Sequence, residues 1–185
     1  MNRLAKACAA VAFVACTPAM AADFSYHYID AGLVLGDAAG SNDGKGPGVA
    51  ISVDMPQLYQ NATVFGGARY LDFDGGHLLN AEGGLGYHMP LGNVVDFNGG
   101  VALELNKYSG GGSDLGFGIN AGVRARPFTP QWELDGGLKY VDIGHYSDTS
   151  VVLGTRYTFQ PGISAGIELA SGDIDYWTLS VRWEL

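Results

Sequence analysis

The last nine residues, Trp177-Thr178-Leu179-Ser180-Val181-Arg182-Trp183-Glu184-Leu185, alternate without a break between apolar and polar side chains. Successive side chains of a β-strand point to opposite faces, so this period of two predicts a strand with one apolar and one polar face. The same pattern recurs about ten times along the chain. The fold is therefore predicted to be all-β, an antiparallel up-and-down barrel of ten strands, with eight strands as the alternative.

The predicted strands are separated by turn-forming glycine, proline, asparagine and aspartate residues. They cover residues 29–35, 49–55, 62–73, 79–89, 95–105, 115–125, 132–141, 151–159, 163–170 and the run that ends at 185. Longer loops are predicted at 36–47, 106–114 and 143–150. For most of the chain, Gly/Asp/Ser-rich connections alternate with proline-containing ones, a pattern typical of barrels that alternate external loops with short periplasmic turns. An even strand count places both termini in the periplasm.

The N-terminus has the features of a secretory signal peptide. Arg3 and Lys6 precede a short apolar stretch at 7–16, and Ala19-Met20-Ala21 matches an A-x-A cleavage site. We therefore predict a signal peptide at 1–21 and a single barrel domain at 22–185. Both cysteines fall within the signal, so no disulfide is expected in the mature chain. Lipoprotein processing at Cys16 is the less favoured alternative.

The mature chain is strongly acidic. Of the 10 Lys and Arg residues, Arg3 and Lys6 lie in the predicted signal, which leaves 8 against 19 Asp and Glu, a net charge of −11. This balance argues against a nucleic-acid partner. The histidines show no metal-ligand spacing, and no phosphate-binding glycine loop is present, so neither a metal nor another cofactor is expected.

The alternation fits a soluble barrel as well as a transmembrane one, so the composition of each face decides between them. Charged residues make up 16% of the chain, against about 25% in typical soluble domains. Glycine, rather than Lys and Glu, dominates the polar face, and aromatic residues gather near strand ends, as interfacial girdles require. These features predict a barrel that spans a bacterial outer membrane, with its apolar face toward lipid.

In such a barrel the polar face lines the lumen. A Lys or Arg that faced lipid at mid-depth would cost about 2 to 4 kcal/mol, so charged strand residues are expected inside. The predicted lumen charge network comprises Arg69, Glu82, Glu104, Arg124, Asp135, Lys139, Arg156, Glu168 and Arg182. It forms either a paired, sealed core or the lining of a narrow polar pore. In the third strand Phe65 and Leu71 share the face of Arg69, which predicts a bulge or a different register there.

The signal sequence, the glycine-rich alternating strands and the closing Trp183-Glu184-Leu185 resemble the small single-domain outer-membrane barrels of the OmpA/OmpX-like type. This resemblance implies a monomer surrounded by outer-membrane lipid and lipopolysaccharide, with a C-terminal strand read by the barrel-insertion machinery. The family's last residue is usually Phe or Trp, whereas this chain ends in Leu185. The expected role is structural, in membrane integrity, with a narrow porin-like diffusion channel as the alternative.

One stretch suggests chemistry. His145-Tyr146-Ser147-Asp148 resembles the H-x-S-N stretch of outer-membrane lipid A deacylases, with Asp148 in place of Asn. The resemblance implies that His145 would activate Ser147 for attack on an acyl ester, and Glu168 is the candidate to orient the histidine. Because a His, a Ser and an acid often occur together in a polar loop, the protein is expected not to be an enzyme, and a lipid A deacylase-like hydrolase stays a minor alternative.

Overall fold

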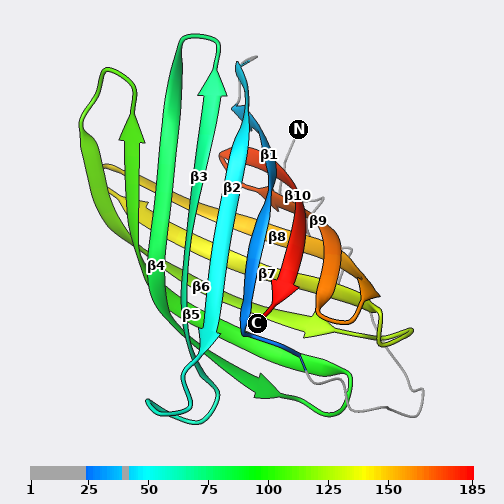
Figure 1. The fold of residues 1–185 in the computed structure, drawn as a ribbon. Coiled ribbons are helices and arrows are strands. Elements are labelled where there is room, and N and C mark those ends of the chain that lie inside the picture. Colours follow the sequence, from blue (N-terminus) through cyan, green and yellow to red (C-terminus); the bar gives the residue numbers. More distant parts are fainter. Residues whose placement is uncertain (1–23, 39–41) are drawn as a thin grey trace, which may run out of the picture.

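The computed structural model describes residues 24–38 and 42–185, and the predicted signal peptide at 1–21 lies outside this range. The described chain forms one closed barrel in which each strand pairs with its neighbours in sequence and the last strand pairs with the first (Figure 1). The strands are β1 (Tyr28–Ala38), β2 (Asn42–Asp54), β3 (Ala62–Phe73), β4 (Gly76–Pro90), β5 (Val95–Tyr108), β6 (Ser113–Ala125), β7 (Trp132–Ile143), β8 (Tyr146–Gln160), β9 (Ile163–Ser171) and β10 (Ile174–Glu184). The prediction of ten antiparallel strands is confirmed.

Within the described ranges, no helix is long and apolar enough to cross a membrane.

The barrel has two different ends. The terminal end carries residues 24–27 and Leu185, together with the connections 55–61, 91–94, 126–131 and 161–162. The hairpin end carries the tight turns at 74–75, 109–112, 144–145 and 172–173, and the hairpins β3–β4 and β5–β6 rise at the top of Figure 1.

Most of the residues predicted as loops at the hairpin end belong to strands. β1 continues to Ala38, β2 begins at Asn42, and β8 begins at Tyr146, so the predicted loops at 36–47 and 143–150 are wrong in extent. Residues 39–41 of the first loop lie outside the described range. Glycine and aspartate are poor strand formers on their own, but here each has a ladder partner, as in the pair Asp37↔Asp43.

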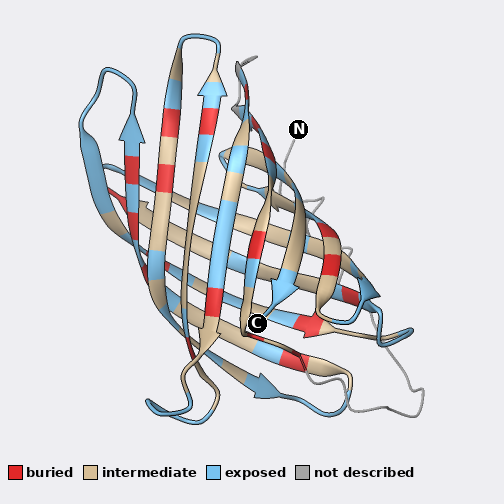
Figure 2. Cartoon of the chain, viewed as in Figure 1, coloured by how far each residue is buried: buried red, intermediate tan, exposed pale blue. Residues whose placement is uncertain are grey.

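The apolar face of the sheet is the outer face. Val101 is 56% exposed and Leu115 is 66% exposed, and the other large apolar residues that alternate with them also face outward. Figure 2 shows exposed and half-buried segments along all the strands in view, with buried ones scattered among them. The outward-facing exposed aromatic residues lie toward the two ends, with Trp132, Tyr157 and Trp183 near the terminal end and Tyr70 and Trp177 toward the hairpin end. An apolar belt between two aromatic girdles is the exterior of a transmembrane barrel.

The third strand has no bulge. β3 pairs with β2 and β4 without a register shift, and the described ladders change register only between Thr158 and Gln160 in β8. The predicted irregularity in β3 is therefore wrong. Leu71 does point into the barrel, where it is fully buried in an apolar cluster with Val34 and Leu78.

The glycines on the inner wall make room for charged side chains. A Cβ at Gly118 would lie 2.6 Å from the Oε1 atom of Glu104, and one at Gly154 would overlap the carboxylate of Asp135. At Gly166 a Cβ would lie 3.1 Å from the guanidinium carbon of Arg156. Glycine in these strands therefore lets neighbouring side chains lie flat against the wall, and much of the space it leaves is filled.

Candidate functional site in the lumen

The nine residues of the predicted charge network all line the interior, in two cavities. The hairpin-end cavity, about 360 Å³, is lined by Arg69, Glu82, Glu104, Lys139, Arg156 and Glu168 among others. The terminal-end cavity, about 340 Å³, is lined by Arg124, Asp135 and Arg182 together with Glu82, Lys139, Arg156 and Glu168. The four charged residues common to both cavities lie in the layer that separates them.

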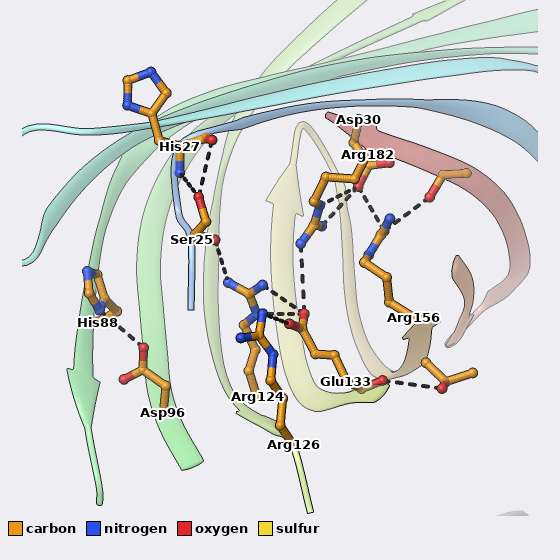
Figure 3. Close-up of polar contacts among 12 residues, drawn as sticks. Ser25, His27, Asp30, His88, Asp96, Arg124, Arg126, Glu133, Arg156 and Arg182 are labelled. Atoms are coloured by element: carbon orange, nitrogen blue, oxygen red, sulfur yellow. Dashed lines mark hydrogen bonds and ion pairs between the residues drawn. The ribbon is translucent and has the colours of Figure 1, made fainter. Parts of the chain in front are cut away.

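Glu133 is the centre of an arginine cluster near the terminal end (Figure 3). It is 4% exposed. Arg124 donates two hydrogen bonds to its Oε1 atom, from Nη2 at 2.7 Å and from Nε at 3.0 Å, and Arg126 donates one to Oε2 at 3.2 Å. Arg182 lies 3.9 Å from the same carboxylate. Three arginines therefore share one carboxylate, and a neutral residue at position 133 would remove this shared negative charge.

Asp30 of β1 is a second carboxylate that is shared by arginines. Its Oδ2 atom accepts hydrogen bonds from Nη2 of Arg156 at 2.9 Å and from Nη2 and Nε of Arg182 at 2.9 and 3.1 Å. Because Arg182 also approaches Glu133, ion pairs run without interruption from β1 through β10 to β7 and β6. This chain of charges crosses the lumen rather than following a single strand.

Residues 24–27 lie across the terminal end of the lumen. Phe24 and Tyr26 are 8% and 7% exposed although they precede the first strand. The guanidinium of Arg124 donates to the backbone carbonyl of Ser25 at 3.0 Å and lies 4.7 Å from the ring centre of Tyr26. Tyr26 also stacks on His88, with ring centres 4.1 Å apart. The N-terminal segment is thus held against the arginine cluster and narrows this mouth of the barrel (Figure 3).

A second group of contacts occupies the middle of the lumen. The Nζ atom of Lys139 lies 2.6 Å from Glu82 and 2.8 Å from Glu104, whose side chain is almost completely buried. Asn80 accepts a hydrogen bond from Arg69 at 3.0 Å and donates one to Asn106 at 2.6 Å. Lys139 thus ties β7 to β4 and β5 across the intervening strand β6, and this group forms part of the layer between the two cavities.

Two carboxylates of the predicted network have no ion-pair partner. Among residues 24–38 and 42–185, no cation lies within 4 Å of the carboxylate of Asp135 or of Glu168. Glu168 is exposed at the surface of the lumen, and Asp135 is half-buried against Gly154. Both carboxylates therefore line the cavities without an ion-pair partner among the described residues.

The prediction from sequence left out the two carboxylates around which the arginines gather. Glu133 shares the polar face with Asp135 and Lys139, so alternation alone identifies it as a lumenal residue. Asp30 alternates with Gly32 in the first strand and could have been found in the same way. The inward placement of Phe24 and Tyr26 has no comparable signal, because these residues precede the strand.

The deacylase-like residues are not brought together. Tyr146 and Asp148 line the hairpin-end cavity, so the intervening Ser147 points to the other face of β8, outside the barrel. Glu168 points into the lumen, and His145 lies in the exposed turn that precedes β8. Ser147 and Glu168 therefore lie on opposite sides of the barrel wall. Nor does the described part of the chain contain a group of three His, Cys, Asp or Glu residues that could hold a metal ion.

An apolar exterior between aromatic girdles and a lumen crossed by ion pairs define a small outer-membrane β-barrel protein. No protein-family model matches the sequence, and neither does any curated protein.

The chain is similar to several solved structures at low sequence identity. The KdgM porin has a TM-score of 0.48 at 11% identity, covering 85% of this chain and 99% of its own. Neisserial surface protein A has a TM-score of 0.48 at 16% identity, covering 87% and 98%. The attachment invasion locus protein Ail of Yersinia pestis has a TM-score of 0.44 at 13% identity, covering 84% and 95%. The assignment to the small outer-membrane β-barrels rests on the exterior and the lumen of this chain and not on these similarities.

Proposed function

We propose that the protein is a structural outer-membrane barrel whose lumen is closed to the passage of solutes. The observation that carries this proposal is the chain of ion pairs Asp30–Arg182–Glu133–Arg124, which crosses the lumen and ends on the carbonyl of Ser25. A barrel of eight strands is just filled by side chains, and ten strands enclose only slightly more space. Here the N-terminal segment and the lysine-centred contacts occupy part of that additional space.

The proposal includes how the protein reaches and occupies the membrane. The chain would be exported through a cleaved signal at 1–21 and inserted by the barrel-insertion machinery through its C-terminal strand. It would act as a monomer, without enzymatic activity, in contact with lipid and lipopolysaccharide. Its contribution to membrane integrity would come from a wall that resists unfolding, since the lumenal ion pairs join strands that are not neighbours.

A narrow diffusion channel is the second candidate. The two lumenal cavities and the exposed carboxylate of Glu168 favour it, because they show that side chains do not fill the whole interior. In that case the contacts of Lys139 with Glu82 and Glu104 would form the constriction, and these charges would select among ions.

Single-channel recording of the purified protein in a planar bilayer separates the two candidates. A heat-modifiability gel, in which an unboiled folded barrel migrates differently from the boiled chain, shows that each sample is folded. A closed barrel gives no conductance steps, either as wild type or as Glu82→Gln. Discrete steps that change in size in Glu82→Gln or Glu104→Gln would replace the structural proposal with the channel.

A further inference from the structure

The hairpin-end cavity has a lining that the closed-barrel proposal does not use. Beyond the central charged layer it is walled by Tyr108, Tyr146 and Tyr176, and it extends to Asp148 and Asp173 at the mouth of the barrel. Its volume, about 360 Å³, lies in the range of pockets that bind small molecules. The even strand count predicts that both termini lie in the periplasm, and this cavity would then open toward the cell exterior.

The two cavities differ in charge. Six carboxylates line the hairpin-end cavity, namely Asp30, Glu82, Glu104, Asp148, Glu168 and Asp173. Only three cations accompany them, Arg69, Lys139 and Arg156, which gives a formal net charge of −3. The terminal-end cavity has four acidic and four basic residues and is formally neutral. A concave site lined by one sign of charge concentrates ions of the opposite sign, so the hairpin-end cavity attracts cations.

Arg182, which does not line this cavity, also pairs with Asp30, but the rest of this negative charge is not compensated among the described residues. Of the six carboxylates, Asp148, Glu168 and Asp173 have no cation within 4 Å among the described residues. Only 1% of Glu104 is exposed. Its Oε2 atom has no hydrogen-bond partner in the described structure, and it shares the single charge of Lys139 with Glu82. The protein therefore supplies too few cations for the acidic groups that it places around this cavity.

The tyrosines provide a second feature that favours a cation. The guanidinium carbon of Arg69 already lies 4.4 Å from the ring centre of Tyr176, so one ring of the wall has a cation on its face. Tyr108 and Tyr146 are 46% and 39% exposed and line the same cavity. Aromatic faces attract ammonium and guanidinium groups, by about 0.5 to 2 kcal/mol per contact in other proteins. The exposed rings thus suit an organic cation better than a hydrated metal ion.

The spacing of the unpaired carboxylates indicates the shape of the ligand. Glu168 lies opposite Gly154 of β8, and Asp148 lies six residues further along that strand. At about 3.4 Å per residue this is a separation of about 20 Å along the wall. A compact ammonium ion would contact only one of these carboxylates. A linear amine with a charged group at each end would extend from Glu168 toward Asp148.

We propose that the hairpin-end cavity binds linear di- and polyamines, with Glu168 as the deep carboxylate, Asp148 and Asp173 as the carboxylates at the mouth, and the tyrosine rings as walls. This goes beyond the structural role proposed above and does not depend on it. The site is bounded by the central layer, to which Glu168 belongs, and opens at the hairpin end, so an amine can enter it whether or not ions pass the terminal end.

Isothermal titration of the folded full-length protein in detergent with spermidine tests the proposal. Saturable binding is expected, and it should weaken as salt rises, because the contacts are charge-assisted. Glu168→Gln and Asp148→Asn should each weaken binding by about tenfold, the effect of losing one charged hydrogen bond. Asp135→Asn is the matched control, because it removes an equally unpaired lumenal carboxylate that lines only the terminal-end cavity. Because Asp135 and Glu168 both lie opposite Gly154, Asp135→Asn has a small electrostatic effect on the site, but it should weaken spermidine binding far less than Glu168→Gln does.

Two results would overturn the proposal. One is the absence of saturable spermidine binding by protein that the gel shows to be folded. The other is equal weakening in Asp135→Asn and Glu168→Gln, which would mean that the amine responds to overall charge and not to this cavity. A linear dicarboxylate of similar length serves as the probe of opposite charge, and tighter binding of that probe would also contradict the assignment. Because these readouts do not use conductance, their failure is distinct from failure of the closed-barrel proposal.

Discussion

The arginine cluster around Glu133 gives a sharp prediction for stability. Glu133→Gln preserves the size of the side chain and removes its charge, while Arg124, Arg126 and Arg182 remain in place. The wild-type carboxylate accepts three charge-assisted hydrogen bonds and is 4% exposed. Removing one partner of a buried ion pair typically costs about 3 to 5 kcal/mol, and here the charge of Arg124 would stay buried without the carboxylate that accepts two of its hydrogen bonds.

Unfolding in guanidinium, followed by tryptophan fluorescence of protein reconstituted in vesicles, measures this loss. For a chain of this size each kcal/mol lowers the melting temperature by about 2 to 4 °C, so a drop of about 10 °C on heat-modifiability gels is also expected. Glu168→Gln is the matched control, since Glu168 is a lumenal carboxylate with no cation within 4 Å among the described residues. Its effect should stay within about 0.5 kcal/mol.

A double-mutant cycle with Arg124→Gln then isolates the pair. The interaction energy should reach about 2 kcal/mol or more, since the two side chains share two hydrogen bonds. The reasoning is refuted if Glu133→Gln and Glu168→Gln destabilise the barrel equally, or if the cycle gives no coupling. Either result would mean that water in the lumen screens the cluster as thoroughly as bulk solvent does.

Three further predictions concern the wall and the N-terminal segment. Val101→Arg places a charge on the lipid-facing side of β5 and should cost about 2 to 4 kcal/mol in vesicle-based unfolding, whereas an exterior that does not face lipid would tolerate it. Gly84→Ala should destabilise the barrel by about 1 to 3 kcal/mol, because its Cβ would overlap the carbonyl oxygen of Val101. The adjacent Gly83→Ala meets no atom within 4 Å and should be neutral or slightly stabilising, so equal effects at the two glycines would contradict the packing described here. Replacing both Phe24 and Tyr26 by alanine removes the rings whose centres lie 5.2 and 4.7 Å from the Arg124 guanidinium. The loss should lower the free energy of unfolding by about 0.5 to 2 kcal/mol per ring, and with it the unfolding midpoint. An unchanged midpoint would show that this segment does not stabilise the barrel.

The strand count and the two faces could be predicted because alternation is a local property. In β10 the residues from Trp177 to Glu184 alternate as the sequence indicates, with Trp177, Leu179 and Trp183 outside. The extent of the hairpins could not be predicted in the same way. Asp37 and Asp43 are weak strand formers, but Asp37 pairs with Asp43 of β2 and with Asp175 of β10, and these pairings between strands place it in the sheet.

Which lumenal carboxylate pairs with which cation could not be predicted from the sequence either. Glu133 and Asp135 lie two residues apart on the same face of β7, yet the arginines converge on Glu133, and Asp135 has no cation within 4 Å among the described residues. Which carboxylate meets which cation depends on the stagger of strands β6, β7 and β10 relative to one another. Alternation along a single strand contains no information on that stagger.

The closure of the barrel has a consequence for how the chain folds. β1 pairs with β10 from Tyr28↔Glu184 to Ala38↔Ile174, so residues at opposite ends of the described sequence become neighbours. Such long-range pairings form slowly, because the loop-closure entropy is lost before the contacts are gained. Until β10 pairs with β1, the incomplete sheet would have two open edges that can pair with other chains. We therefore expect that folding is limited by the joining of this seam and that the unfinished barrel needs protection from aggregation until the seam forms.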